Sequence, residues 1–302
     1  MNSPTSLSTP PPTFTPPSGL TSLGLALDLA PQAFGELRAT HEAQVTPAEL
    51  RERMLEDGYL YLPGLLDREQ VLNIQRLVTE RIAQGGNSHS SHDLAQNNAP
   101  LAELLYTGRM IEFYEKLLGG PVKHFDHTWF RAVAGGGSGT YPHCDIVYMG
   151  RGTFNLCTAW VPMGDVPLDV GGLMVLEHSH RQAATLANYL QRDVDVYCTN
   201  RQDAPDIESG AKTWQDWDGR LSSDPVSLRA KLGGRWLSTN FQAGDVLTFG
   251  MGTVHASLDN RSNRFRLSSD SRYQLASEPA DERWIGANPI AHGPAGKIGK
   301  IC

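Results

Sequence analysis

The chain has none of the features that would direct it to a membrane or to nucleic acid. Its 302 residues contain no apolar stretch of about 18 residues, so we expect no membrane span. No segment is rich in Lys and Arg, and the formal net charge is −7, which argues against a phosphate backbone or an anionic membrane surface as a partner. Hydrophobic residues make up 40% and charged residues 20%, as in globular proteins.

Cysteine is scarce and widely spaced. The four cysteines, Cys144, Cys157, Cys198 and Cys302, show no C-x-x-C spacing. We therefore expect reduced thiols, and neither a disulfide framework nor a structural zinc site. No Lys or Arg precedes Arg38, which argues against a secretory signal or an Arg-rich transit peptide. These absences together predict a cytoplasmic protein.

The N-terminal segment is poor in residues that could be buried. Residues 2–23 are rich in Ser, Thr and Pro, and such a composition cannot offset the chain entropy that folding removes. We expect a disordered tail over 1–23, with a proline motif for a partner as the alternative. A single domain is expected over 24–302, because the length suits one decorated β domain. No internal repeat is found.

The first part of this domain, 46–120, is predicted to be helical. Thr46, Pro47 and Glu49 form a capping box at a helix start. Gly58 is expected to end this helix, and a strand is expected over 59–64. Asp67 would cap a second helix, which Gly85-Gly86 would stop. A third helix is expected over 99–118 and would end at Gly119-Gly120.

From His124 onward the pattern becomes that of an all-β sandwich or barrel. Short apolar or alternating runs are separated by Gly, Asp and Asn. The expected strands are 126–133, 146–149, 155–163, 172–177, 245–250 and 264–275. The β-barrel core is thus expected over 124–180 and 236–275, with an insertion over 181–235. This Trp-containing insertion is either a lid over a site or a packed surface excursion.

Two distant segments carry side chains that suit a metal. His143 and Asp145 are two positions apart, and on a strand such residues point to the same face. His255 follows a predicted strand far along the chain, and a barrel can bring it close. Two imidazoles and one carboxylate form the ligand set of non-haem Fe(II) oxygenases. The H-x-D pair by itself is common by chance, so the prediction of a metal site depends mainly on the additional His255.

An arginine follows the second histidine. Arg266 and Ser268 share one face of a predicted strand, where a guanidinium and a hydroxyl would bind a carboxylate. Arg264 lies on the same face by parity, so parity cannot choose between the two arginines.

At this point the chain resembles the phytanoyl-CoA dioxygenase family of Fe(II)- and 2-oxoglutarate-dependent oxygenases. The resemblance covers about residues 50–275. Each matching piece is loose, but their order is specific: 58–64, 141–145, 156–160, 171–180, 244–246 and 255–266. It implies a mainly β fold with flanking α-helices and a double-stranded β-helix (jelly-roll, cupin-like) core.

The resemblance also implies roles for individual residues. His143, Asp145 and His255 would be the iron ligands, and Arg266 would hold the far carboxylate of 2-oxoglutarate with help from Ser268. Trp160 falls where the family has a Trp beside the co-substrate. With O2, such a site releases succinate and CO2 and hydroxylates a C–H bond of a small organic substrate. The presence of Asp145 favours hydroxylation over halogenation, although desaturation and ring formation use the same ligands.

Several points remain open at the level of sequence. Glu177-His178 stands where the family usually has Gly, and we expect structural roles for His178 and His180 rather than a second metal site. The sequence does not identify the substrate or the oligomeric state. Tyr148, Arg151 and Asn155 could contact substrate, and Trp214, Trp217 and Trp236 could form an aromatic wall, although packing is the more common role for each. The alternatives are a non-catalytic β-barrel binding protein and a zinc-dependent hydrolase that uses the same ligands.

Overall fold

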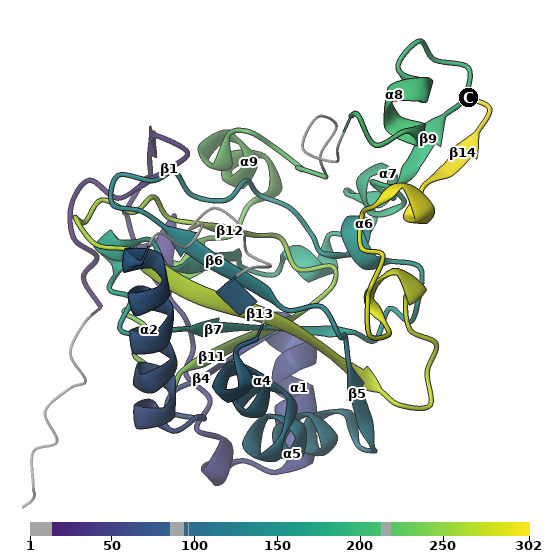
Figure 1. Cartoon of the computed structure of the whole chain (residues 1–302). Helices are drawn as coiled ribbons and strands as arrows, with labels where there is room; N and C mark the ends of the chain where they lie inside the picture. Colours follow the sequence, from purple (N-terminus) through teal and green to yellow (C-terminus); the bar gives the residue numbers. More distant parts are fainter. Residues whose placement is uncertain (1–13, 85–93, 96, 213–218) are drawn as a thin grey trace, which may run out of the picture.

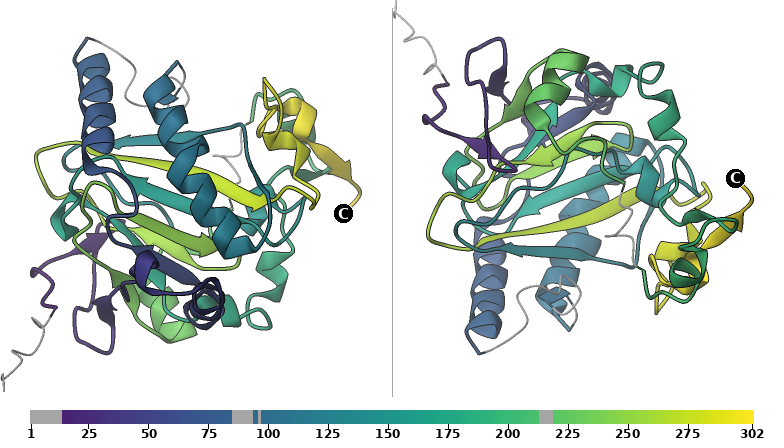
Figure 2. Two further views of the ribbon diagram at one scale, coloured as in Figure 1. Left: turned by 90° about the horizontal axis from the view of Figure 1, so that it is seen from below. Right: turned by 90° about the horizontal axis from the view of Figure 1, so that it is seen from above.

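Two β-sheets face each other, and helices cover the outside of the larger sheet (Figures 1 and 2). The computed structural model describes residues 14–84, 94–95, 97–212 and 219–302. The expectations for residues 1–13, Gly85-Gly86, Trp214 and Trp217 lie outside these ranges. In the described part of the chain, no helix has the length and apolar character needed to cross a membrane.

The larger sheet has six strands, and every pair of neighbouring strands in it is antiparallel. Its order is β4 (Tyr59–Leu62), β11 (Val246–Gly250), β7 (Cys157–Pro162), β13 (Arg266–Leu275) and β5 (Val122–His124), and β6 (Trp129–Val133) also pairs with β13. β13 is its longest strand and lies beside β7 over six residue pairs, from Ser268↔Pro162 to Tyr273↔Cys157.

The smaller sheet has four strands. Its order is β12 (His255–Ser257), β8 (Leu173–Leu176), β10 (Trp236–Ser238) and β3 (Phe34–Glu36). β8 pairs antiparallel with β12 and β10, whereas β10 and β3 are parallel. Among the described residues the two sheets do not join into a closed barrel, so the core is a jelly-roll of two facing sheets.

Side chains alternate between two cores along each strand. On β11, Leu247 and Phe249 pack between the sheets, whereas Val246 packs against the helices. On β7, Trp160 points inward and Val161 points outward in the same way. This period of two is what a strand buried on both faces requires. The prediction of a mainly β fold with flanking helices is confirmed.

The helices described on the outer face of the six-stranded sheet pack into one hydrophobic core with it (Figure 2). They are α1 (Pro47–Asp57), α2 (Arg68–Ala83), α4 (Ala99–Tyr106) and α5 (Gly108–Leu118). The Thr46 capping box, the Asp67 cap and the left-handed Gly58 at φ 77° are present as predicted. The expected helix over 99–118 is two helices, because Thr107 adopts extended φ/ψ of −137° and 176°.

Residues 14–23, expected to belong to the disordered tail, are part of the folded body. They lead into a hairpin of β1 (Thr21–Ser22) and β2 (Leu25–Ala26). Leu20 is fully buried, and the Ser22 hydroxyl donates a hydrogen bond of 2.8 Å to the carbonyl of Ser257. This burial and this hydrogen bond offset the conformational entropy lost when residues 14–23 become ordered. The polar composition of the segment reflects only that entropy cost.

The insertion over 181–235 forms α7 (Ala187–Leu190), β9 (Val196–Cys198), α8 (Ala204–Glu208) and α9 (Pro225–Leu232). Trp236 lies buried on β10. Its indole N–H donates to the carbonyl of Pro225 at 3.0 Å. Trp236 thus has the packing role rather than a place in an aromatic wall around substrate.

The expectation of reduced thiols throughout is also wrong, because Cys198 and Cys302 form a disulfide. β9 pairs in parallel with β14 (Ile298–Lys300), and this pairing brings the two cysteines together (Figure 1). The bond joins residues separated by 104 positions, a relationship that local spacing cannot reveal. Cys144 and Cys157 are free and buried, and burial raises the pKa of Cys157 to about 12.

Candidate active site

The three predicted metal ligands converge at one end of the space between the sheets. Oδ1 of Asp145 lies 3.7 Å from Nε2 of His143 and 3.6 Å from Nε2 of His255. One ligand atom from each residue fits within a group no more than 4.8 Å across. His255 begins β12 on the smaller sheet, and Phe249 of the larger sheet packs 4.4 Å from its ring.

The segment that carries His143 and Asp145 is not the expected strand. His143 forms a single bridge with His255. Asp145 precedes the short helix α6 (Ile146–Met149) with helical φ/ψ of −64° and −23°, and its side chain makes no capping hydrogen bond. The strand expected over 146–149 is therefore wrong. The two side chains meet because a bridge is followed directly by a helical turn, and not because alternate residues of a strand share a face.

Both imidazoles are oriented by the main chain. Nδ1 of His143 lies 2.7 Å from the carbonyl of Tyr141, and Nδ1 of His255 lies 3.0 Å from the carbonyl of Thr253. A carbonyl only accepts, so each Nδ1 carries the proton and each Nε2 keeps its lone pair for a metal. Burial, together with His255, lowers the pKa of His143 to about 3, and burial also lowers the pKa of His255. Neutral imidazoles are the form that binds a metal.

The second oxygen of Asp145 is held by protein groups. Oδ2 accepts hydrogen bonds from the Thr158 hydroxyl and, at 3.1 Å, from Nη2 of Arg272. Burial would raise the pKa of Asp145, but Arg272 and the two imidazoles lower it on balance. Thr158 and Arg272 were missed by the sequence analysis. The alternation along β13 offered a signal, because Arg272 shares its inner face with Arg266, Ser268 and Asp270.

Arg266 reaches the interior, and Arg264 does not. Arg266 is 2% exposed, its Nη1 donates to the Ser268 hydroxyl at 3.3 Å, and its Nε has no partner among the described residues. Arg264 is exposed and bonds the carbonyl of Asp165 at 3.4 Å. Burial and the charge of Arg131 lower the pKa of Arg266 to about 10. A buried guanidinium with an unpartnered N–H is stabilised when an anionic ligand binds to it.

Trp160 lies beside Arg266 in a small inner cavity. This cavity encloses about 20 Å³ and is lined by all three predicted metal ligands as well as by Trp160 and Arg266. The indole N–H of Trp160 is buried and has no partner within the described part of the chain. Arg266 and Trp160 thus share one cavity with the predicted metal ligands, and each has a buried N–H donor without a partner among the described residues.

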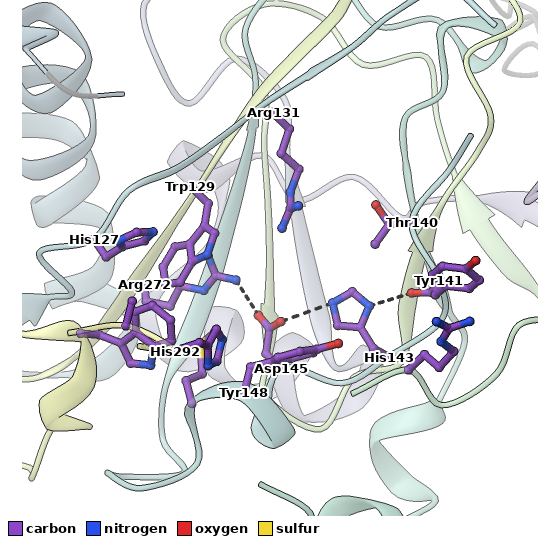
Figure 3. A pocket seen from close by; sticks show the side chains of 14 residues that line it. His127, Trp129, Arg131, Thr140, Tyr141, His143, Asp145, Tyr148, Arg272 and His292 are labelled. Carbon is purple, nitrogen blue, oxygen red and sulfur yellow. Dashed lines mark hydrogen bonds and ion pairs between the residues drawn. The ribbon is translucent and has the colours of Figure 1, made fainter. Parts of the chain in front are cut away.

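A larger cavity of about 510 Å³ is also lined by His143 and Asp145 (Figure 3). Its aromatic wall consists of His127, Trp129, Tyr141, Tyr148, Trp284 and His292. Arg220 of the insertion also lines it, with its guanidinium carbon 4.2 Å from the ring centre of Tyr141. Trp284 and His292 lie in the segment after β13. They were not predicted, because no local pattern in that segment indicates a site.

The other residues singled out from sequence lie elsewhere. Arg151 donates to Asp193 at 2.6 Å and Asn155 to Glu278 at 3.3 Å, and neither lines the cavity that contains Tyr148. His180 contacts the carbonyl of Leu55 through Nε2 at 3.1 Å. His178 adopts a left-handed conformation at φ 56° in the preceding turn. Both histidines lie outside the converging ligand group.

Comparison with known proteins agrees with this geometry. The sequence pattern of the phytanoyl-CoA dioxygenase (PhyH) family matches residues 114–268, just over half of the 302-residue chain. The chain belongs to the phytanoyl-CoA dioxygenase family. The matched segment contains β13 as far as Ser268 and includes all three predicted metal ligands.

Named relatives are similar at the level of sequence and of fold. The 1-deoxypentalenic acid 11-beta-hydroxylase of Streptomyces arenae is 26% identical over 250 residues, which is 74% of this chain and 79% of that protein. EctD from S. alaskensis, solved with 2-oxoglutarate and 5-hydroxyectoine, has a TM-score of 0.58 at 16% identity over 94% of this chain and 99% of its own. The carbocyclase SnoK, from nogalamycin biosynthesis, has a TM-score of 0.58 at 17% identity over 81% and 90%.

The family membership makes this protein an oxygenase that depends on Fe(II) and 2-oxoglutarate. The residues present fit both groups. Two neutral imidazoles and one carboxylate converge with their ligand atoms toward one point, and donors without partners surround the adjoining cavity. The jelly-roll with its flanking helices is the architecture expected from the family resemblance.

Proposed function

We propose that the protein hydroxylates a C–H bond of a small organic substrate, with 2-oxoglutarate as co-substrate and release of succinate and CO2. The observation that carries this proposal is the convergence of His143, Asp145 and His255 at the boundary between two cavities. One cavity contains a buried arginine that suits a dicarboxylate. The other is wide enough for an organic substrate.

His143, Asp145 and His255 would hold the Fe(II), which supplies the O2 activation coupled to decarboxylation of the 2-oxo acid. The protein residues fix the position of this chemistry. The carbonyls of Tyr141 and Thr253 keep Nε2 of each histidine turned toward the metal position. Thr158 and Arg272 hold Oδ2 of Asp145, which leaves Oδ1 as the ligand atom.

Arg266 and Ser268 would bind the far carboxylate of 2-oxoglutarate. The Nε–H of Arg266 has no partner in the described structure, and the Ser268 hydroxyl lies beside the guanidinium. The partnerless indole N–H of Trp160 offers a further donor. Because the inner cavity encloses only about 20 Å³, a five-carbon dicarboxylate would also occupy the adjoining end of the larger cavity.

The larger cavity would hold the substrate next to the metal position. Its aromatic side chains exclude water and present flat apolar surface, which suits a compact, largely apolar body. Hydroxylation, rather than halogenation, is favoured because Asp145 occupies the carboxylate position. The similar Streptomyces arenae protein is named as a hydroxylase, which supports the same choice.

An anaerobic titration tests this function. Addition of 2-oxoglutarate to the Fe(II)-loaded protein should produce a weak visible charge-transfer band, and His143→Ala should abolish it. Exposure to O2 with a substrate should release succinate and place one labelled oxygen atom from O2 in the product.

Two results would exclude the proposal. A protein that hydrolyses its substrate without 2-oxoglutarate and O2 would be a zinc-dependent hydrolase with the same ligands. A protein that gives no band and is unaffected by His143→Ala would be a binding protein without oxygenase activity.

A further inference from the structure

Arg272 lies at the junction of the two cavities and has donors that nothing described in the structure uses. It is 4% exposed and lines both the inner cavity and the larger one. Its Nη2 donates to Oδ2 of Asp145 at 3.1 Å, and its guanidinium carbon lies 4.1 Å from the ring centre of Trp129 (Figure 3). Its Nε and Nη1 are buried and have no hydrogen-bond partner among the described residues.

Two nitrogens without partners, which together carry three N–H groups, are costly on a buried cation. A guanidinium has five N–H donors in a fixed plane, so a single bond through Nη2 cannot satisfy the others. A charged donor taken out of water without a partner destabilises the fold unless a ligand supplies the acceptor. Trp129 covers one face of the guanidinium but accepts no in-plane hydrogen bond, so the Nε and Nη1 donors remain available in the plane.

The charges around the larger cavity favour an anion. Arg131, Arg220 and Arg272 line it, and Asp145 is the only carboxylate among its described lining residues. Asp145 is also a predicted metal ligand, so its charge would be offset by the metal. Asp270, which lines the inner cavity, accepts from Arg131 at 3.0 Å. A cationic cavity in a chain with a net charge of −7 marks a local preference for anions.

We propose that Arg272 binds a carboxylate at the junction of the two cavities, in addition to holding Asp145. A planar guanidinium edge matches a carboxylate with two parallel hydrogen bonds, which a lysine ammonium cannot reproduce. The carboxylate comes either from the 2-oxo acid end of 2-oxoglutarate or from a substrate that is an organic acid with an apolar body. The first source rests on the proposed function, whereas the second does not require it.

The test compares Arg272→Lys with the native protein in two binding measurements. In the first, 2-oxoglutarate is titrated anaerobically into the Fe(II)-loaded protein and the charge-transfer band is followed. In the second, adamantane carboxylate and its neutral carboxamide are titrated by calorimetry into the metal-free protein. Arg264→Lys is the matched control, because Arg264 is exposed and lies outside both cavities. Co(II) affinity is measured in parallel, since the Arg272→Lys variant retains a cation beside Asp145.

We expect Arg272→Lys to lower the affinity of the protein for one of the two carboxylates by about 10-fold or more. A loss of this size follows when hydrogen bonds to a charged group are removed. Loss of 2-oxoglutarate affinity alone assigns the co-substrate as the source. Loss of adamantane carboxylate affinity alone, with the carboxamide unchanged, assigns an acidic substrate. Co(II) affinity should stay within about 3-fold, because the charge next to Asp145 is kept.

Unchanged affinity for both carboxylates would overturn the inference, even if the native protein shows the charge-transfer band and the proposed function stands. An equal fall in the affinities for 2-oxoglutarate and for Co(II) would also overturn the inference. The substitution would then act by disturbing the predicted metal ligand Asp145, and not by removing a contact with 2-oxoglutarate. If the native protein shows no band, the proposed function fails and the metal-free measurement still decides the role of Arg272. Thermal melting checks that the variant folds, and Arg272→Gln replaces it under the same criteria if it does not.

Discussion

The main chains of His143 and His255 hydrogen-bond to each other in both directions, with N–O distances of 3.0 Å. This pair forms an isolated antiparallel bridge, in which the two imidazoles lie 4.1 Å apart at their ring centres. Because backbone bonds fix the spacing, the chain itself sets the positions of the two histidine ligands. Such preorganisation reduces the ordering that metal binding must accomplish.

His255→Ala should remove one ligand without unfolding the protein. Fe(II) or Co(II) affinity should fall by more than the roughly 10- to 100-fold that outer-shell changes cost. Calorimetric titration measures the affinity. His178→Ala is the control, since His178 lies outside the ligand group and should leave metal binding unchanged. Equal losses from the two variants would contradict the ligand assignment.

Arg266→Ala should weaken 2-oxoglutarate binding while sparing the metal. The expected loss is roughly 10- to 100-fold, from charge-assisted hydrogen bonds worth about 1.5–3 kcal/mol. Titration of the visible band reports this affinity, and metal titration on the same variant shows whether Fe(II) still binds. Arg264→Ala should change neither, because its side chain is exposed. A larger effect from Arg264→Ala would reverse the assignment of the two arginines.

The metal-free protein should lose stability as the pH falls below neutrality. Burial lowers the pKa of His143 from its ordinary 6.5 to about 3, so between these values the unfolded state binds the proton and the folded state does not. The stabilising contribution is therefore present above pH 6.5 and is lost as the pH falls toward 3. The size is on the order of a few kcal/mol. Urea unfolding at pH 7 and pH 5 measures it, and His143→Gln should show a smaller difference between the two.

Reduction of the Cys198–Cys302 bond should destabilise the protein. Closing a loop over a separation of 104 residues typically contributes about 2–4 kcal/mol. Cys198→Ser should therefore lower the free energy of unfolding by a similar amount, and reductant should have no further effect on that variant. Thiol titration of the denatured, non-reduced native protein should detect only Cys144 and Cys157. Detection of all four cysteines without reductant would show that the bond does not form.

Local physics in the sequence was enough for most of the helices and strands, although the strand predicted over 146–149 is the helix α6. Thr46 and Glu49 cap α1 wherever the helix packs, and Gly58 accepts the left-handed φ of 77° that ends it. Alternation along 245–250 and 264–275 predicted buried strands, because a strand between two cores must be apolar or satisfied on both faces. These signals act over a few residues, so they can be read without the fold. The same local view failed at 99–118, where extended backbone at Thr107 divides the helix.

The sequence by itself determined which side chains could form the site, because it fixes where each imidazole, carboxylate and guanidinium stands along the chain. Tertiary structure decided how they meet. It placed His143 against His255 through a backbone bridge, turned Asp145 into the site through α6, and chose Arg266 over Arg264 by burying one and exposing the other. It also brought in Arg272 and joined Cys198 to Cys302. These outcomes depend on contacts between residues far apart in the chain, and composition, spacing and parity carry no information about such distances.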